Sequence, residues 1–206
     1  MLLGRRAVLL RGGAAVAVWL ATSAHTPYRQ WVVYRQRRLL IGCSRAEPES
    51  YELGKRVVAA LLERLPESGA RVSRAPDTFR LASLLSTDQM DVALLRRDDA
   101  AALARGREPF RDYGAVPITA LYALGDYLLV SRADFPEHHA YLVSRALDAG
   151  PAVVPGGGLP PPDGLAADLP THPGSAAYAQ GLPVPAAPEP VAADHDHEHE
   201  HVDGHR

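Results

Sequence analysis

Two spacings of apolar residues alternate along residues 39–150, one typical of β-strands and the other of α-helices. Apolar residues at every fourth position from Leu53 to Leu65 predict a helix over residues 49–65, which Pro66 ends. Asp77 is a residue type that caps helix N-termini, and Pro136 is typical of a first turn. The expected strands are 39–42, 70–75, 92–95, 116–124 and 127–131, and the further helices follow Asp77, cover 98–105, and run from Asp134 and Pro136 to Gly150.

Strands separated by helices in this order predict an α/β body over residues 39–150 with a mostly parallel sheet. Ten of the fifteen residues from 150 to 164 are Gly or Pro, so residues 151–170 are predicted to be a linker. Residues 171–181 indicate a short turn and helix. Residues 182–206 are predicted to be a disordered Pro- and Ala-rich linker and tail.

The composition narrows the possible functions. A chain of 206 residues with 47% hydrophobic residues has room for one domain with appendages. A net charge of −2 gives no sign of nucleic-acid binding. The chain has no Gly-x-Ser-x-Gly, His-Glu-x-x-His or Gly-Lys-Ser/Thr motif, and the single cysteine, Cys43, has no sequence-local His partner. We therefore expect a protein that is not an enzyme and needs no cofactor.

Residues 1–24 are typical of an export signal. Arg5 and Arg6 precede an apolar stretch that ends in small residues at Ala24. The segment 4–10 resembles a twin-arginine signal, with Gly4 in place of the usual Ser or Thr. The unbroken apolar run is shorter than the ~20 residues of a spanning helix. We expect a periplasmic protein, either released or anchored to the inner membrane, with residues 25–38 as a juxtamembrane linker whose residues 31–34 could lie at the interface.

Cys43 allows two interpretations. Residues 40–43 match a lipoprotein cleavage box in their letters, but Arg37 and Arg38 interrupt the apolar segment that such a box needs upstream. A buried first strand carrying a small cysteine is the favoured interpretation.

The last thirteen residues, 194–206, alternate histidines with carboxylates. Five of the nine histidines lie there: His195, His197, His199, His201 and His205. Imidazole suits Zn, Ni or Co, and neighbouring carboxylates ease the approach of a dication. The tail is therefore a candidate metal site, and an inert polar terminus or a purification remnant is the alternative.

Four segments carry a resemblance to a known family. Residues 42–54 form a turn between the first strand and helix, residues 87–98 carry an apolar strand between Asp91 and Asp98, residues 128–136 precede a return helix, and residues 172–175 read His-Pro-Gly-Ser. Together they resemble the TAXI family, the extracytoplasmic solute receptors of TRAP-type transporters.

The resemblance implies a type II periplasmic binding-protein fold, shortened here to about one lobe. It also implies a non-catalytic receptor for a small organic anion, working with a transporter membrane subunit. This chain departs from the family at Cys43, Ser44 and Arg45, which stand where the family has loop glycines. A single lobe also cannot enclose a ligand on both sides.

A retained ligand site would lie at the carboxyl ends of the parallel strands. The candidate ligand-binding residues there are Ser44, Tyr51, Arg74, Thr78 and Asp98. Ser44 and Tyr51 could offer hydroxyls, and Arg74 or Arg96 could pair with a carboxylate. Structural roles stay open, because Asp98, like Asp77, could cap a helix and Tyr51 could pack at the core. His138, His139 and His172 are expected to be surface or turn residues.

Overall fold

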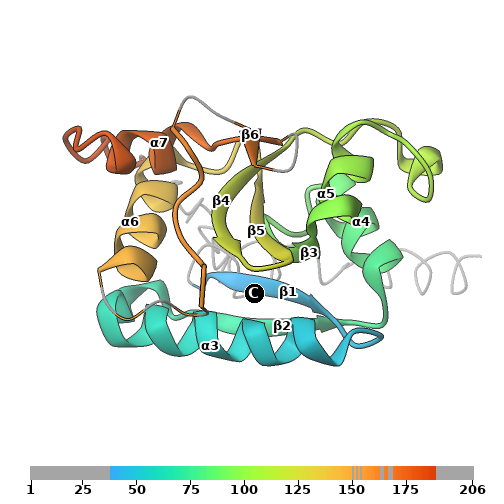
Figure 1. Ribbon diagram of the computed structural model, residues 1–206, viewed down its shortest axis with the longest axis horizontal. Helices are drawn as coiled ribbons and strands as arrows, with labels where there is room; N and C mark the ends of the chain where they lie inside the picture. Colours follow the sequence, from blue (N-terminus) through green and yellow to red (C-terminus); the bar gives the residue numbers. More distant parts are fainter. Residues whose placement is uncertain are drawn as a thin grey trace, which may run out of the picture.

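The computed structural model describes residues 38–149, 151, 153, 155–162, 165–166 and 169–188. The predicted export signal and the histidine-rich tail lie outside the described residues. The strands within the described residues are β1 Leu40–Ser44, β2 Arg71–Ala75, β3 Val92–Arg96, β4 Ile118–Leu124, β5 Tyr127–Arg132, β6 Leu165–Ala166 and β7 Leu169–Pro170. The helices are α3 Pro48–Arg64, α4 Thr78–Ser86, α5 Arg97–Ala104, α6 Glu137–Asp148 and α7 Pro173–Ala179, with short 3-10 turns η1 Pro66–Ser68 and η2 Arg111–Tyr113. The α/β prediction is confirmed for this part of the chain (Figure 1).

The main sheet is mixed, which corrects the expectation of a mostly parallel one. Its strand order is β2-β1-β3-β5-β4. Strand β1 pairs in parallel with β2 and β3, whereas β5 is antiparallel to both β3 and β4. Only Gly125 and Asp126 join β4 to β5, and a two-residue connection can form a hairpin but not a crossover. Gly125 has a φ of 64°, a conformation that glycine adopts without strain.

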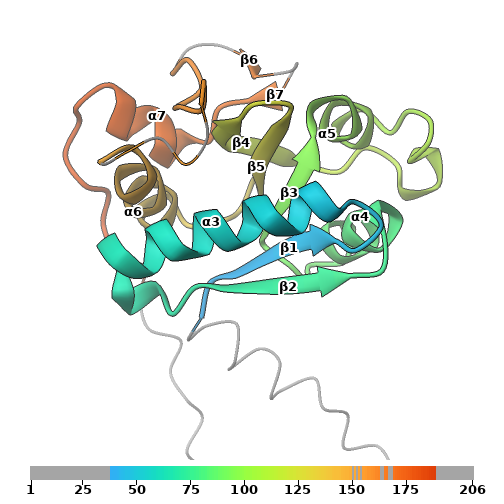
Figure 2. The same cartoon turned by 60° about the horizontal axis from the view of Figure 1, so that its bottom comes forward.

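Helices cover both faces of this sheet. Apolar residues of α3 and α6 form one buried cluster against it, and those of α4 and α5 form a second cluster. Figure 2 shows α3 lying across β1 and β2, with α4 on the other side of the same strands. The chain therefore leaves β1 over one face and returns from β2 to β3 over the other. This reversal places a topological switch point between β1 and β3.

Helix α3 and strand β1 approach closely at one point. Cys43 is fully buried in β1, as the buried-strand interpretation predicts. A Cβ atom built on Gly54 of α3 would lie 2.3 Å from Cys43 Sγ, far inside van der Waals contact. A small residue on the strand and no side chain on the helix are what allow the two elements to meet here.

The region after α6 contacts the body along most of its described length. Gly158 forms an antiparallel bridge with Ala123, and Thr171 a parallel bridge with Ala120, so both contact the outer edge of β4. Helix α7 packs against α6, where the Ser144 hydroxyl donates to Ser175 Oγ at 2.8 Å. No described helix has the length and apolar character needed to cross a membrane.

Candidate functional site

Polar side chains from four elements meet at the carboxyl ends of β1 and β3. Ser44 ends β1 and Arg96 ends β3. Because β5 is antiparallel, its first residue, Tyr127, lies opposite Arg96 at the same edge. Thr78 begins α4 just beyond β2. The strand order thus gathers these groups beside the switch point, as the sequence predicts for Ser44 and Thr78.

The centre of this group is Glu47, the residue before α3. Its Oε1 accepts a hydrogen bond from the Thr78 hydroxyl at 2.8 Å. Its Oε2 accepts from the Tyr127 hydroxyl at 2.8 Å and from Arg96 Nε at 3.1 Å. We call Glu47, Thr78, Arg96 and Tyr127 the Glu47 cluster. Three donors from three elements converge there on one carboxylate.

The electrostatics of the cluster hold the Glu47 carboxylate in place. Burial, and then the hydrogen bond to Glu47, raise the pKa of Tyr127 well above its ordinary value of 10, so the phenol keeps its proton and donates. The Arg96 guanidinium lies 4.9 Å from the centre of the Tyr127 ring and 3.6 Å from a Glu49 oxygen. The Glu47 side chain is 22% exposed, so solvent reaches its carboxylate.

Ser44, the last residue of β1, carries a further polar group at this end of the sheet. Its hydroxyl is buried and is, among the described residues, a side-chain oxygen with no hydrogen-bond partner. The backbone N–H of Ser44 donates to Ser50 Oγ at 3.3 Å. An unsatisfied buried hydroxyl is unfavourable by about 1–3 kcal/mol, which makes Ser44 a candidate to bind a ligand or a water molecule.

The other predicted ligand-binding residues lie apart from the cluster. Tyr51 stacks between Arg74, 4.8 Å from its ring centre, and Lys55, 5.1 Å away, on the α3 side of the sheet. Asp98 is exposed in the first turn of α5, where no described contact joins it to the others. It does not cap that helix, because the N-cap position is Arg96. Asp77 does cap α4, accepting from the Arg80 N–H at 2.8 Å.

Glu47 and Tyr127 are the cluster residues that were not predicted from the sequence. Glu47 lies in the predicted turn after β1, so its place near the site could have been predicted from the sequence. The place of Tyr127 could not, because only the pairing of β5 with β3 brings it to this end of the sheet.

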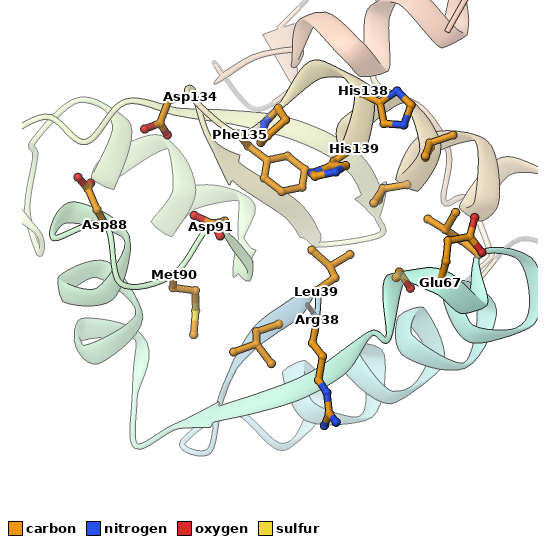
Figure 3. A pocket seen from close by; sticks show the side chains of 16 residues that line it. Arg38, Leu39, Glu67, Asp88, Met90, Asp91, Asp134, Phe135, His138 and His139 are labelled. Carbon is orange, nitrogen blue, oxygen red and sulfur yellow. The ribbon is translucent and has the colours of Figure 1, made fainter. Parts of the chain in front are cut away.

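Two hollows lie outside the Glu47 cluster, a small recess and a larger cavity. The recess, about 330 Å³, borders the cluster, but three carboxylates (Glu49, Glu52 and Asp126) face one arginine, Arg56, so it suits an anion poorly. The cavity, about 550 Å³, lies at the opposite edge of the sheet, between the start of β1 and the N-terminus of α6 (Figure 3). We place the candidate anion site at the Glu47 cluster, because its donors converge and those of the cavity do not.

Neither metal chemistry nor thiol chemistry is supported within the described residues. They contain no group of three or more His, Cys, Asp or Glu side chains arranged to hold a metal ion. The five candidate metal ligands of the tail, His195 to His205, lie outside them. Burial raises the pKa of Cys43 to about 12, so its thiol stays protonated and is a poor nucleophile.

No family model matches this chain, and no curated protein matches it in sequence.

Proposed function

We propose that this chain is an exported, non-catalytic binding protein for a small organic anion, and that the Glu47 cluster is the seat of that anion's carboxylate. The observation that carries the proposal is the convergence of Thr78, Arg96 and Tyr127 on a single carboxylate. A guanidinium and two hydroxyls from three elements are the donors that a carboxylate ligand needs.

Glu47 then acts as an internal occupant of the site. Its own side chain makes no capping hydrogen bond to α3, although the residue is the N-cap of that helix. The neighbouring Arg45 and Ala46 are exposed, but their backbone N–H groups donate to the Ala75 and Pro76 carbonyls at 2.9 and 3.1 Å. We therefore propose that the Glu47 side chain rotates away while the backbone of the loop stays in place. A ligand carboxylate would replace Glu47 on the three donors.

The wider biological role follows from the sequence resemblance. We propose a solute-receptor-like subunit in the periplasm that serves TRAP-type transport and contacts a transporter membrane subunit. The α/β fold with a switch point at the proposed site is compatible with this role.

A second candidate function rests on the tail. The alternation of histidines with carboxylates over residues 194–206 favours a periplasmic protein that binds or delivers Zn, Ni or Co. The two functions concern different parts of the chain and can be tested separately.

Removing the internal carboxylate tests the anion site. In isothermal titration with a panel of small mono- and dicarboxylates, Glu47→Ala is expected to bind about tenfold more tightly than the wild type, because the ligand no longer competes with Glu47. Arg96→Gln is expected to weaken binding in both backgrounds. Glu52→Ala is the matched control, since Glu52 pairs with exposed Lys55 on the same helix. A folded Glu47→Ala protein that binds no carboxylate would rule out this site.

A further inference from the structure

The cavity lies near the amino end of β1, at the opposite end of the strands from the Glu47 cluster. Its lining suits an apolar group. Seven of the sixteen residues that line it carry a large apolar side chain, and they come from the start of β1, the end of α3, the segment before β3 and the start of α6. These apolar residues are Leu39, Leu40, Leu65, Met90, Phe135, Leu142 and Val143. A concave apolar space of about 550 Å³ is large enough for one or two aromatic side chains.

The rim of the cavity is acidic. Asp88, Asp91 and Asp134 lie on one side and Glu67 on the other (Figure 3). Arg132, behind the rim, binds Asp134 in bidentate fashion with distances of 2.9 and 2.6 Å and also contacts Asp88. With Arg132 and the lining Arg38 counted against four carboxylates, and histidines neutral, the cavity carries a net charge of −2.

The sequence that enters the body beside this cavity has the complementary character. The described chain begins at Arg38, which is itself a wall residue. The ten residues before it read YRQWVVYRQR, with a central Trp-Val-Val-Tyr and three arginines, Arg29, Arg35 and Arg37. Trp31 lies seven positions before Arg38, and seven residue steps can span up to about 23 Å, so Trp31 can reach the cavity from Arg38.

We propose that the cavity is an intrachain docking site for residues 28–37, with Trp31 and its apolar neighbours in the cavity and the arginines at the acidic rim. The volume, the apolar lining and the opposite charges of −2 and +3 all fit this occupant. The proposal is independent of the anion site, which lies at the opposite edge. Under this proposal, residues 28–37 pack against the α/β body of the same chain and not at a membrane interface.

Trp31 gives a direct optical test. The chain has two tryptophans, Trp19 and Trp31, so full-length Trp19→Phe leaves Trp31 as the only reporter. Its emission is expected at shorter wavelength than in the denatured chain, with several-fold weaker quenching by acrylamide. Adding Leu142→Arg, which places a cation on the cavity wall, is expected to abolish this shielding. Leu62→Arg is the matched control, since Leu62 is also a helical leucine but is 44% exposed and lies outside the cavity.

A second variant keeps the test valid if the Leu142→Arg protein does not fold. Arg35→Glu with Arg37→Glu changes only the segment, leaves the cavity residues intact and is expected to reduce the shielding as well. The proposal is overturned if Trp31 is quenched equally in all variants. It is also overturned if vesicles of phosphatidylcholine and phosphatidylglycerol with brominated chains quench Trp31 in both the Leu142→Arg and the Leu62→Arg proteins, because the segment then lies in lipid. Shielding that vanishes on dilution would instead mean that a second copy supplies the segment.

Discussion

Cys43 and Gly54 are matched in size at the point where α3 meets β1. The strand contributes a small thiol and the helix contributes no side chain, so the two backbones come together without a void. Glycine inside a helix is unfavourable by about 1 kcal/mol relative to alanine, so its presence here has a packing reason. The same contact buries the thiol and raises its pKa to about 12.

Gly54→Ala is therefore expected to destabilise the protein by about 1–2 kcal/mol, although the substitution favours the helix, because overpacking outweighs helix propensity here. Denaturant unfolding measures the change. Cys43→Ala removes the sulfur that the new methyl group meets, so the double variant is expected to recover much of the loss. Additive effects of the two substitutions would show that the pair is not in contact.

At the scale of the elements, α7 depends on a histidine at its start. His172 is fully buried and is the N-cap residue of α7. Its Nδ1 accepts from the Gly174 N–H at 3.1 Å, so Nε2 carries the proton that is donated to the Phe135 carbonyl at 2.9 Å. Burial is the main cause that lowers the pKa of His172, and the ring is neutral in the folded protein.

This neutral histidine makes stability depend on pH. Below the ordinary histidine pKa of 6.5 the unfolded chain binds a proton that the folded chain resists. The free energy of unfolding is therefore expected to fall as the pH is lowered through this value, and to be fully present above it. His172→Asn keeps a capping side chain but does not titrate, so urea unfolding between about pH 7.5 and about pH 5 should show a weaker dependence for the variant. His139, whose pKa is also lowered by burial, is replaced by Gln in a parallel control. An unchanged pH dependence in His172→Asn would contradict the assignment.

The order of helices and strands was readable from the sequence because its signals are local. Periodicity placed α3, and Asp77 marked the start of α4. Strand pairing is not local: the insertion of β5 between β3 and β4 leaves no pattern in the residues themselves. That insertion moves Tyr127 to the carboxyl edge, which is why Ser44 and Thr78 could be proposed from the sequence and Tyr127 could not.

At the scale of the whole molecule, the proposed metal-binding tail and the body are separable. Replacing the five tail histidines, His195 to His205, with alanine is expected to remove Ni²⁺ and Zn²⁺ binding while the melting temperature of the body stays unchanged. Replacing His138 and His139 instead is expected to leave metal affinity intact, because among the described residues they belong to no group of three or more side chains arranged to hold a metal ion. Isothermal titration and thermal unfolding with and without a chelator make the comparison. Retained affinity in the tail variant would place the metal elsewhere.

The two edges of the main sheet bear on the solubility of the molecule. An unpaired edge strand can add strands from other chains and so begin aggregation. The outer edge of β4 is partly covered by its bridges to Gly158 and Thr171. No described residue pairs with the outer edge of β2, but that strand carries exposed Arg71 and Arg74, whose like charges repel an incoming copy of the same strand. The sheet is thus protected against polymerisation by backbone coverage at one edge and by charge at the other.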